Sequence, residues 1–282
     1  MSLVIKKEGI LTTVQDLGRT GFRRLGVNPG GVMDRTAARL VNVLLGNDEN
    51  SALLEMHFPA GDIIFDHKTI FALGGADLDA RLAGLPIENW KVHVAEANVP
   101  LRFSGKVSGE RAYLAVLGGF FVKEWLGSKS TNLVAAFGGF DGRRLKTGDR
   151  IDAPEMPDRS PAAEHSFISR SLIPRYSRFP TVRVIPGAEF DFLTVQSQET
   201  FRNEDFVVSM NSNRMGYRLA GKSLKQIDAI EIVSTAVGFG TIQLLPDGQL
   251  IVLMADHQTS GGYPRIAHVI EPDLPLLAQI GP

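Results

Sequence analysis

The chain contains no cysteine, and this absence excludes disulfide bonds, thiolate metal ligands and a cysteine nucleophile. It carries almost no net charge, −1 at pH 7, because 30 basic residues balance 31 acidic ones. Such a balance offers no electrostatic footprint for nucleic acid or for an anionic membrane surface. No apolar run approaches the roughly 18 residues that a membrane-spanning helix requires. We therefore expect neither a nucleic-acid partner nor a membrane partner.

Several catalytic motifs are missing as well. There is no G-x-x-x-x-G-K-[ST] phosphate loop and no G-x-S-x-G nucleophile elbow. The six histidines form no pair at metal-ligand spacing with a carboxylate, so we expect no metal site. The first residues lack the apolar core and cleavage site of a secretion signal. We therefore expect a cytoplasmic protein.

The composition that remains is that of an ordinary globular protein, 44% hydrophobic and 22% charged. Asp34 predicts the N-cap of a helix running to about Leu45, with Gly46 as its stop and one apolar face. From 52 to 151 the pattern changes to short alternating or apolar runs cut by turn residues at intervals of about 8–12 residues. This pattern predicts a mainly β protein, a barrel or a sandwich, with a few short helices.

Three polar, glycine-containing loops are the candidates for function. The densest is A-D-H-Q-T-S-G-G-Y-P, residues 255–264, which follows a buried apolar strand. The others are residues 14–26, with three arginines and three glycines, and residues 210–221. Guanidinium groups and backbone N–H groups in such loops can hold an anion or a carboxylate. The alternative is that each loop is a solvated turn.

Two of these loops share the pattern R-x-G-[FY]-R, at 19–23 and 214–218. In each case an apolar–Glu–apolar strand follows, around Glu55 and Glu231, and then a glycine turn and further strands in the same order. This order indicates two domains related by duplication. We predict an N-terminal domain over 1–155, a connector over 156–180 and a C-terminal domain over 181–282, whose polar loops line a shared cleft.

Side-chain direction limits which groups near residue 256 can act together. Adjacent strand residues point to opposite faces, so Asp256 and His257 cannot both face one pocket. If Asp256 faces inward it can serve as a base or as an orienting carboxylate, and His257 is then a surface residue or a residue of the second barrel. Tyr263 can donate a phenolic hydrogen bond to an oxyanion, and Arg214 can act similarly. The structural alternatives are that Tyr263 plugs a barrel and that Arg214 pairs with Asp256 or Glu231.

Several stretches together resemble the KipA group, also called allophanate hydrolase subunit 2 or the C subunit of 5-oxoprolinase, a biotin-dependent carboxyltransferase-like family. They include V-Q-D-L-G-R-T-G-F, L-G-S-K-S-T-N, S-N-R-M-G-Y-R-L-A-G and Q-T-S-G-G-Y-P. The resemblance covers nearly the whole chain. It implies two cyclophilin-like β-barrel domains. The family usually continues past L-A-Q-I with another strand, whereas this sequence stops at Gly281-Pro282, so we expect the closing strand of the second barrel to be missing here or to be supplied by a partner.

The resemblance also implies a heteromeric 5-oxoprolinase that opens 5-oxo-L-proline to L-glutamate with ATP. Its partners would be a KipI-like B subunit and a third subunit, with ATP held at or by a partner and no need for biotin. One alternative is carboxyl transfer from biotin to urea, although the chain has no M-K-M carrier motif. The other is a non-enzymatic antagonist of a kinase inhibitor.

For the lactam-opening reaction we assign catalytic roles to Asp256, Tyr263 and Arg214. The residues expected to bind the substrate come from all three loops. They are Gln15, Asp16, Arg19, Asn213, Tyr217, Gln258, Thr259, Gly261 and Gly262.

Overall fold

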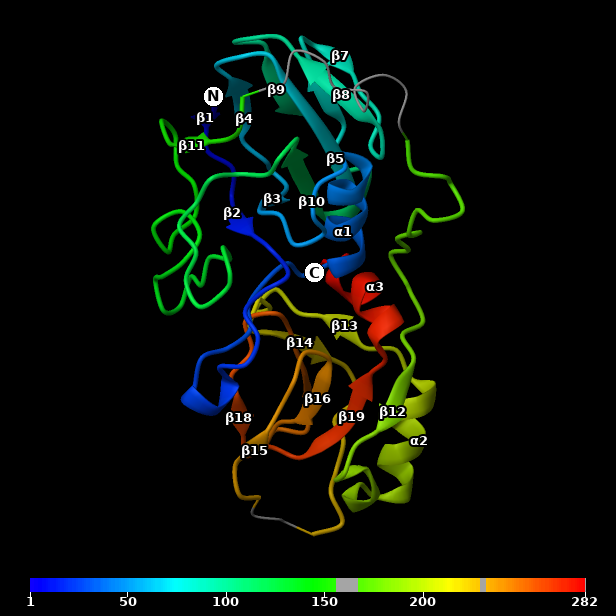
Figure 1. The fold of residues 1–282 in the computed structure, drawn as a ribbon. Helices are drawn as coiled ribbons and strands as arrows, with labels where there is room; N and C mark the ends of the chain where they lie inside the picture. The colour runs from blue at the N-terminus through cyan, green and yellow to red at the C-terminus, as the bar shows by residue number, and fades with distance from the viewer. Residues whose placement is uncertain (156–166, 229–231, 282) are drawn as a thin grey trace. The chain divides into compact units, whose positions relative to one another are not determined.

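The computed structural model describes residues 1–155, 167–228 and 232–281 (Figure 1). The chain falls into two compact units that are not simply consecutive in sequence. Unit 1 comprises Met1–Arg19 and Gly30–Arg178, and unit 2 comprises Thr20–Pro29 and Phe179–Pro282. The chain thus passes through unit 2 once, for ten residues, before it completes unit 1.

The described residues of unit 1 form two antiparallel sheets and one α-helix. The first sheet has the order β11-β1-β4-β9-β6-β7 and the second has the order β2-β3-β10-β5-β8. The elements are β1 (Ser2–Lys7), β2 (Thr12–Gln15), α1 (Arg35–Leu44), β3 (Leu53–His57), β4 (Asp62–Phe65), β5 (Thr69–Asp77), β6 (Ala80–Leu82), β7 (Leu85–Pro86), β8 (Val92–Ala95), β9 (Pro100–Phe103), β10 (Ser108–Val116) and β11 (Arg150–Asp152).

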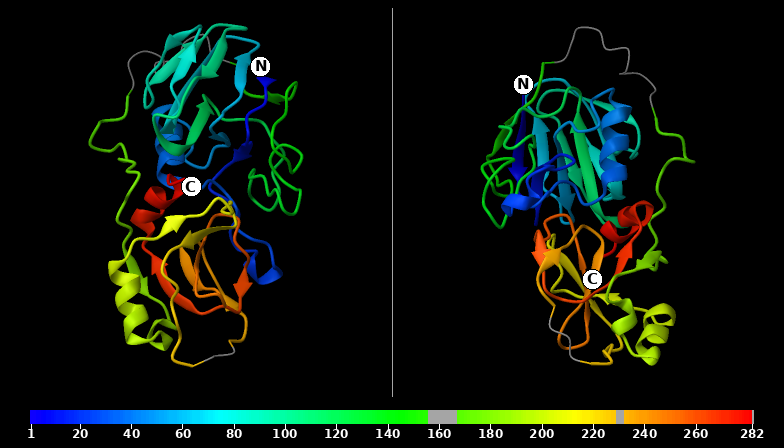
Figure 2. Two further views of the ribbon diagram at one scale, coloured as in Figure 1. Left: turned by 180° about the vertical axis from the view of Figure 1, so that it is seen from behind. Right: turned by 60° about the horizontal axis from the view of Figure 1, so that its bottom comes forward.

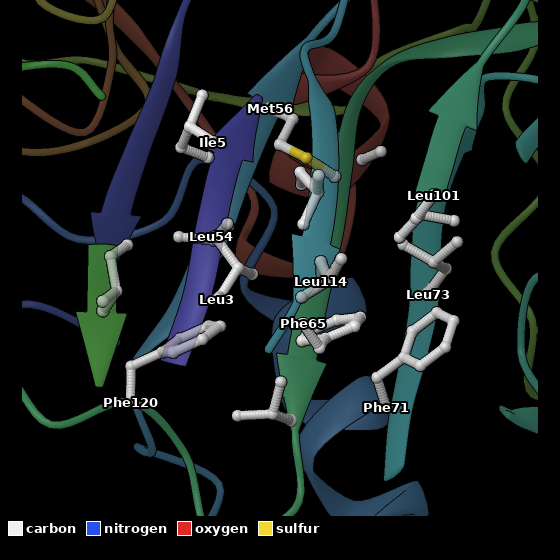
Figure 3. Packing of buried hydrophobic residues seen from close by; sticks show 14 of the residues in the cluster. Leu3, Ile5, Leu54, Met56, Phe65, Phe71, Leu73, Leu101, Leu114 and Phe120 are labelled. Carbon is white, nitrogen blue, oxygen red and sulfur yellow. The ribbon is translucent and has the colours of Figure 1, made fainter. Parts of the chain in front are cut away.

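The main core of unit 1 combines side chains of both sheets. Leu3 and Ile5 of β1 belong to the same buried cluster as Leu54 of β3 and Leu114 of β10 (Figure 3). The rings of Phe65 and Phe71, one from each sheet, lie 5.5 Å apart between centroids. Alternate residues of each strand point into this layer, as the two-residue period of a β-strand requires.

The opposite face of the second sheet carries α1 (Figures 1 and 2). Intervening strand residues such as Leu53, Ile70 and Tyr113 pack there against Ala38 and Val41 of the helix. The central strands are therefore buried on both faces, which explains their nearly continuous apolar sequences. The predicted helix is confirmed, since the Asp34 side chain accepts a 2.8 Å hydrogen bond from the N–H of Ala37.

Unit 2 contains a six-stranded antiparallel sheet, in the order β12-β19-β16-β17-β14-β13, and the short pair β15-β18. Its elements are η1 (Arg23–Leu25), β12 (Val184–Pro186), η3 (Phe190–Phe192), α2 (Val195–Asn203), β13 (Val207–Val208), β14 (Gly216–Ala220), β15 (Thr235–Ala236), β16 (Thr241–Leu244), β17 (Leu250–Leu253), β18 (Ser260–Gly261), β19 (Arg265–Val269), η4 (Glu271–Asp273) and α3 (Leu274–Ala278).

The mainly β character predicted from the sequence is confirmed. The division into units differs from the predicted domains in two segments. Residues 20–29 lie in unit 2 rather than with the rest of 1–155, and unit 1 extends to Arg178, through most of the predicted connector over 156–180. The two R-x-G-[FY]-R motifs are consequently not equivalent: residues 19–23 cross from one unit to the other, whereas 214–218 lead into β14. Glu231, a landmark of the predicted repeat, is outside the described residues. None of the helices in the described ranges is long and apolar enough to cross a bilayer.

Candidate functional site

The centre of the candidate site in unit 2 is an ion pair between Arg214 and Asp256. Arg214 Nε donates to Asp256 Oδ2 at 2.8 Å, and Nη2 donates to Oδ1 at 3.0 Å. The two side chains are only 5% and 2% exposed. This is a buried, bidentate arginine–carboxylate pair, the strongest form of such a hydrogen-bonded contact.

Strand pairing brings these two residues together. Arg214 precedes β14 and Asp256 follows β17, and these strands are antiparallel neighbours in which Gly216 faces Leu253. The backbone contact continues past the strands, because the N–H of Asp256 donates to the carbonyl of Arg214 at 2.8 Å. Both carboxylate oxygens of Asp256 bind the guanidinium. The geometry therefore favours an orienting role for Asp256 over that of a base.

His257 is buried, with 2% of its surface exposed, so of the two positions expected for it the one at the surface is wrong. That prediction treated 256 and 257 as strand neighbours on opposite faces. However, β17 ends at Leu253, and Asp256 lies in a turn in which the N–H of His257 donates to the carbonyl of Met254. The alternation rule does not apply in a turn, and both side chains are enclosed.

The rest of the 255–264 loop is held by glutamine amides. Gln243, buried in β16, donates from Nε2 to the carbonyl of Tyr263 at 3.3 Å. A Cβ added at Gly261 would lie only 2.8 Å from Gln243 Nε2, so any larger residue at this position would require the Gln243 amide to move. Tyr263 itself is 46% exposed, and its side chain is accessible to a substrate. Gln258 and Thr259 lie between this turn and Asp256.

The remaining predicted residues of unit 2 flank Arg214. Asn213 is exposed, and its Oδ1 accepts a 2.8 Å hydrogen bond from the N–H of Met215. Asn213 thereby closes the turn before β14. Tyr217 is buried, with 2% exposed, and lies in β14 opposite Val252. Of these two side chains, only that of Asn213 is accessible to solvent.

The predicted residues of unit 1 form a second polar group around Asp16. Its carboxylate accepts hydrogen bonds from the hydroxyls of Ser128 and Ser130 and from the backbone N–H groups of Gly18 and Lys129. Among the described residues every donor to Asp16 is neutral. Asp16 is buried, and it joins the first loop to the S-K-S-T-N segment that contributed to the family resemblance.

Arg19 belongs to the same group. It is 1% exposed, and its Nη2 donates to the carbonyl of Ser130 at 2.7 Å. Its guanidinium carbon lies 5.4 Å from the ring centroid of Trp125 and 5.1 Å from that of Phe137, within the range of a cation–π contact. Gln15 is fully buried beside it, with Nε2 donating to the carbonyl of Thr131 at 3.2 Å.

A third buried polar group was not predicted from the sequence. The hydroxyl of Tyr113 donates to Glu55 Oε2 at 2.9 Å and accepts from the N–H of Asp34, and the hydroxyl of Tyr176 donates to Asp34 Oδ2. Burial raises the pKa of Tyr113 well above its usual value, and the carboxylates of Glu55 and Asp34 raise it further. The glutamate within the apolar run L-L-E-M was the available signal.

The structure therefore gathers the predicted residues into two groups, each within one unit. Arg214, Asp256 and the 258–263 loop form the group in unit 2, and Gln15, Asp16 and Arg19 form the group in unit 1. Across the part of the chain that the structure describes, no three histidine, aspartate or glutamate side chains lie close enough to hold a metal ion.

Comparison with known proteins agrees with this fold. The profile of the carboxyltransferase domain, subdomain A and B, matches residues 25–282. The chain therefore belongs to this family. It is 39% identical over 279 residues to the C subunit of 5-oxoprolinase from Escherichia coli, covering 99% of this chain and 87% of that protein. The corresponding protein of Haemophilus influenzae is 37% identical over 269 residues, which cover 95% of this chain and 84% of that one.

The fold also matches part of a larger enzyme. The crystal structure of the K. lactis urea amidolyase superposes with a TM-score of 0.90 at 29% identity. The match covers 100% of this chain but only 18% of the urea amidolyase chain. This chain thus corresponds to less than a fifth of that enzyme.

Proposed function

We propose that this chain is the C subunit of an ATP-dependent 5-oxoprolinase, which hydrolyses 5-oxo-L-proline to L-glutamate together with other subunits. The observation that carries the proposal is the 39% identity to the E. coli C subunit along nearly the full length of both chains. A name that designates one subunit implies others, and the resemblance described above suggests a KipI-like B subunit and a third subunit.

The side chain to which we assign a catalytic role lies in the 255–264 loop, where a substrate can reach it. Hydrolysis adds one water across the lactam C–N bond, so that the carbonyl carbon becomes a carboxylate and the ring nitrogen becomes an amine. Negative charge develops on the carbonyl oxygen as that carbon is attacked. Tyr263, 46% exposed beside two glycines, is the side chain we assign as hydrogen-bond donor to this oxygen. The buried Arg214–Asp256 pair holds the loop from which Tyr263 projects.

Arg19 and Arg214, the loop arginines that the sequence suggested could hold an anion, do not fit the role of binding a phosphate group. Arg19 is 1% exposed and lies against Ser130, Trp125 and Phe137, and Arg214 is 4% exposed and pairs with Asp256. A phosphate group needs arginine donors that it can reach. We therefore place the ATP site on a partner protein and assign no step involving ATP to residues of this chain.

Carboxyl transfer to urea is the second candidate. The likeness to the K. lactis urea amidolyase and 34% identity to the urea amidolyase of Lachancea kluyveri favour it. However, the match to the Lachancea enzyme covers only 16% of that protein. A carboxyltransferase of this kind would need a biotin carrier from another chain.

The test is to reconstitute the chain with its candidate partner subunits and to measure glutamate release from 5-oxo-L-proline and ATP. We expect turnover with the wild-type chain. Tyr263→Phe should lower the rate by about 100-fold, the loss typical of removing one oxyanion donor. The matched control is Tyr176→Phe, which removes a hydroxyl bonded to Asp34 in unit 1 and should leave the rate within about twofold.

The competing functions give different results in the same reconstitution. Turnover that requires a carboxybiotin carrier and urea, without glutamate release, would establish carboxyl transfer instead. Tight binding to the partner subunits without either reaction would establish the non-enzymatic antagonist. Equal losses of rate in Tyr263→Phe and Tyr176→Phe would show that the hydroxyl of Tyr263 has no specific role in the reaction.

A further inference from the structure

The segment Thr20–Pro29 belongs to unit 2, and backbone contacts within unit 1 hold together the residues that precede and follow it. The N–H of Val32 donates to the carbonyl of Asp16 at 2.9 Å, which ties the two sides of the passage together. Gly31, at φ +91°, approaches the backbone of Gly18 so closely that an added Cβ would lie 2.7 Å from the Gly18 nitrogen. The segment Thr20–Pro29 therefore leaves from and returns to one defined point.

Within unit 2 this segment contacts the backbone of the Arg214–Asp256 turn. Asn28 Nδ2 donates to the carbonyl of Asp256 at 3.0 Å. The same residue 256 donates its N–H to the carbonyl of Arg214, so its peptide groups are held on both sides. Asn28 is 228 positions away from Asp256 in sequence, and no local pattern predicts this contact.

The other end of the segment reaches the opposite side of the same loop. Arg23 Nη2 donates to the carbonyl of Val237. The N–H of Val237 in turn donates to the carbonyl of Thr259 at 3.3 Å, and Thr235 and Ala236 pair with Gly261 and Ser260. The segment thus touches the 255–264 loop directly at Asp256, and indirectly, through Val237, at Thr259.

We infer that Thr20–Pro29 is part of the candidate site of unit 2, and that Asn28 is a positioning residue for Asp256 and the loop that carries Tyr263. A loop with two adjacent glycines has many conformations available, so its working geometry has to be imposed by contacts. Asn28 and Arg23 supply such contacts from outside the strands of unit 2. The catalytic consequence rests on the proposed function, whereas the structural one does not.

The structural consequence is tested on the isolated full-length chain by hydrogen–deuterium exchange. Asn28→Asp keeps the shape of the side chain but removes the donor, and Arg23→Ala removes the other contact. We expect about fivefold faster exchange at the amides of Asp256 and Val237, because one hydrogen bond contributes about 1 kcal/mol net. Amides of β3 and β10 in unit 1 should exchange at the wild-type rate.

Two matched controls separate this effect from a general loosening. Asn203→Asp removes a donor to the carbonyl of Glu199 on α2, elsewhere in unit 2. Arg24→Ala removes the exposed neighbour of Arg23 with the same change in charge. Both should leave exchange at Asp256 and Val237 within about twofold of wild type.

The catalytic consequence is tested in the reconstituted complex. A positioning residue acts on the chemical step, so Asn28→Asp should lower kcat by about tenfold and change KM by less than about twofold. Unchanged exchange at Asp256 would overturn the inference, and so would faster exchange with an unchanged kcat in an active complex. If the wild-type complex releases no glutamate, the proposed function fails, and the exchange rates alone decide whether the segment holds the loop.

Discussion

The two R-x-G-[FY]-R motifs bury their first arginines in different surroundings. Arg19 in unit 1 lies against a carbonyl oxygen and two aromatic rings, whereas Arg214 in unit 2 forms a bidentate pair with Asp256. Their neighbouring acids differ in the same way: Asp16 accepts from four neutral groups, and Asp256 accepts from a guanidinium. The same five-residue pattern therefore occurs with two different ways of stabilising a buried charge.

This difference teaches that a buried carboxylate can be stabilised by charge or by hydrogen bonds alone. A carboxylate that balances a buried cation cannot lose its charge without leaving that cation uncompensated in the low-dielectric interior. A carboxylate that accepts only from hydroxyl and amide groups has no cation to balance. Replacing it by an amide weakens these hydrogen bonds but leaves no unpaired charge, so the loss of stability is smaller. Matched aspartate-to-asparagine substitutions at the two sites separate these cases.

The largest effect is expected for Asp256→Asn. It removes the carboxylate from a guanidinium whose side chain is 5% exposed, and we expect a loss of about 3–5 kcal/mol in the free energy of unfolding of unit 2. Hydrogen exchange of β14 and β17 amides measures this loss. The double variant Asp256→Leu with Arg214→Met should recover most of the stability while abolishing glutamate release. A loss below about 1 kcal/mol would show that the pair is not an electrostatic unit.

A smaller effect is expected for Asp16→Asn, because an amide keeps one acceptor oxygen for the four neutral donors. We expect a loss of about 1–2 kcal/mol in the free energy of unfolding of unit 1. Both tryptophans, Trp90 and Trp125, lie in unit 1, so urea unfolding followed by tryptophan fluorescence reports on it. A loss as large as that of Asp256→Asn would mean that Asp16 also balances a buried cation, and the contrast between the units would disappear.

The smallest effect concerns acid pH and two further arginine–carboxylate pairs of unit 2. Arg183 holds the pKa of Asp273 below its usual value, and Arg265 does the same for Glu189, in each case through side-chain hydrogen bonds. A carboxyl whose pKa is lower in the folded protein contributes stability above its unfolded pKa. That contribution is lost as pH falls through the folded value. Unit 2 should therefore lose stability progressively below about pH 4.5.

The measurement is hydrogen exchange of β12 and β19 amides at a series of pH values, corrected for the intrinsic exchange rate. Asp273→Asn and Glu189→Gln should each flatten the acid slope, since the substituted side chain no longer titrates. An unchanged slope in both variants would show that these two pairs do not account for the acid sensitivity of unit 2.

The described structure bears out what local chemistry alone could predict. An N-cap aspartate, an apolar face and a stop glycine defined α1, because all three signals lie close together along the chain. Runs of alternating or apolar residues likewise indicated the mainly β fold. The Arg214–Asp256 pair was foreseen as one alternative, but sequence offered no reason to prefer it over a pair with Glu231.

Tertiary structure decided the features that depend on residues far apart in the chain. Asn28 meets Asp256 across 228 positions, and the burial of His257 follows from where β17 ends rather than from its own neighbours. Periodicity and capping are local properties, so the amino-acid sequence by itself determined the helix, the strands and the polar loops. The pairing of polar groups depends on strand register and on the course of the chain, because these contacts form only when the whole sheet is assembled.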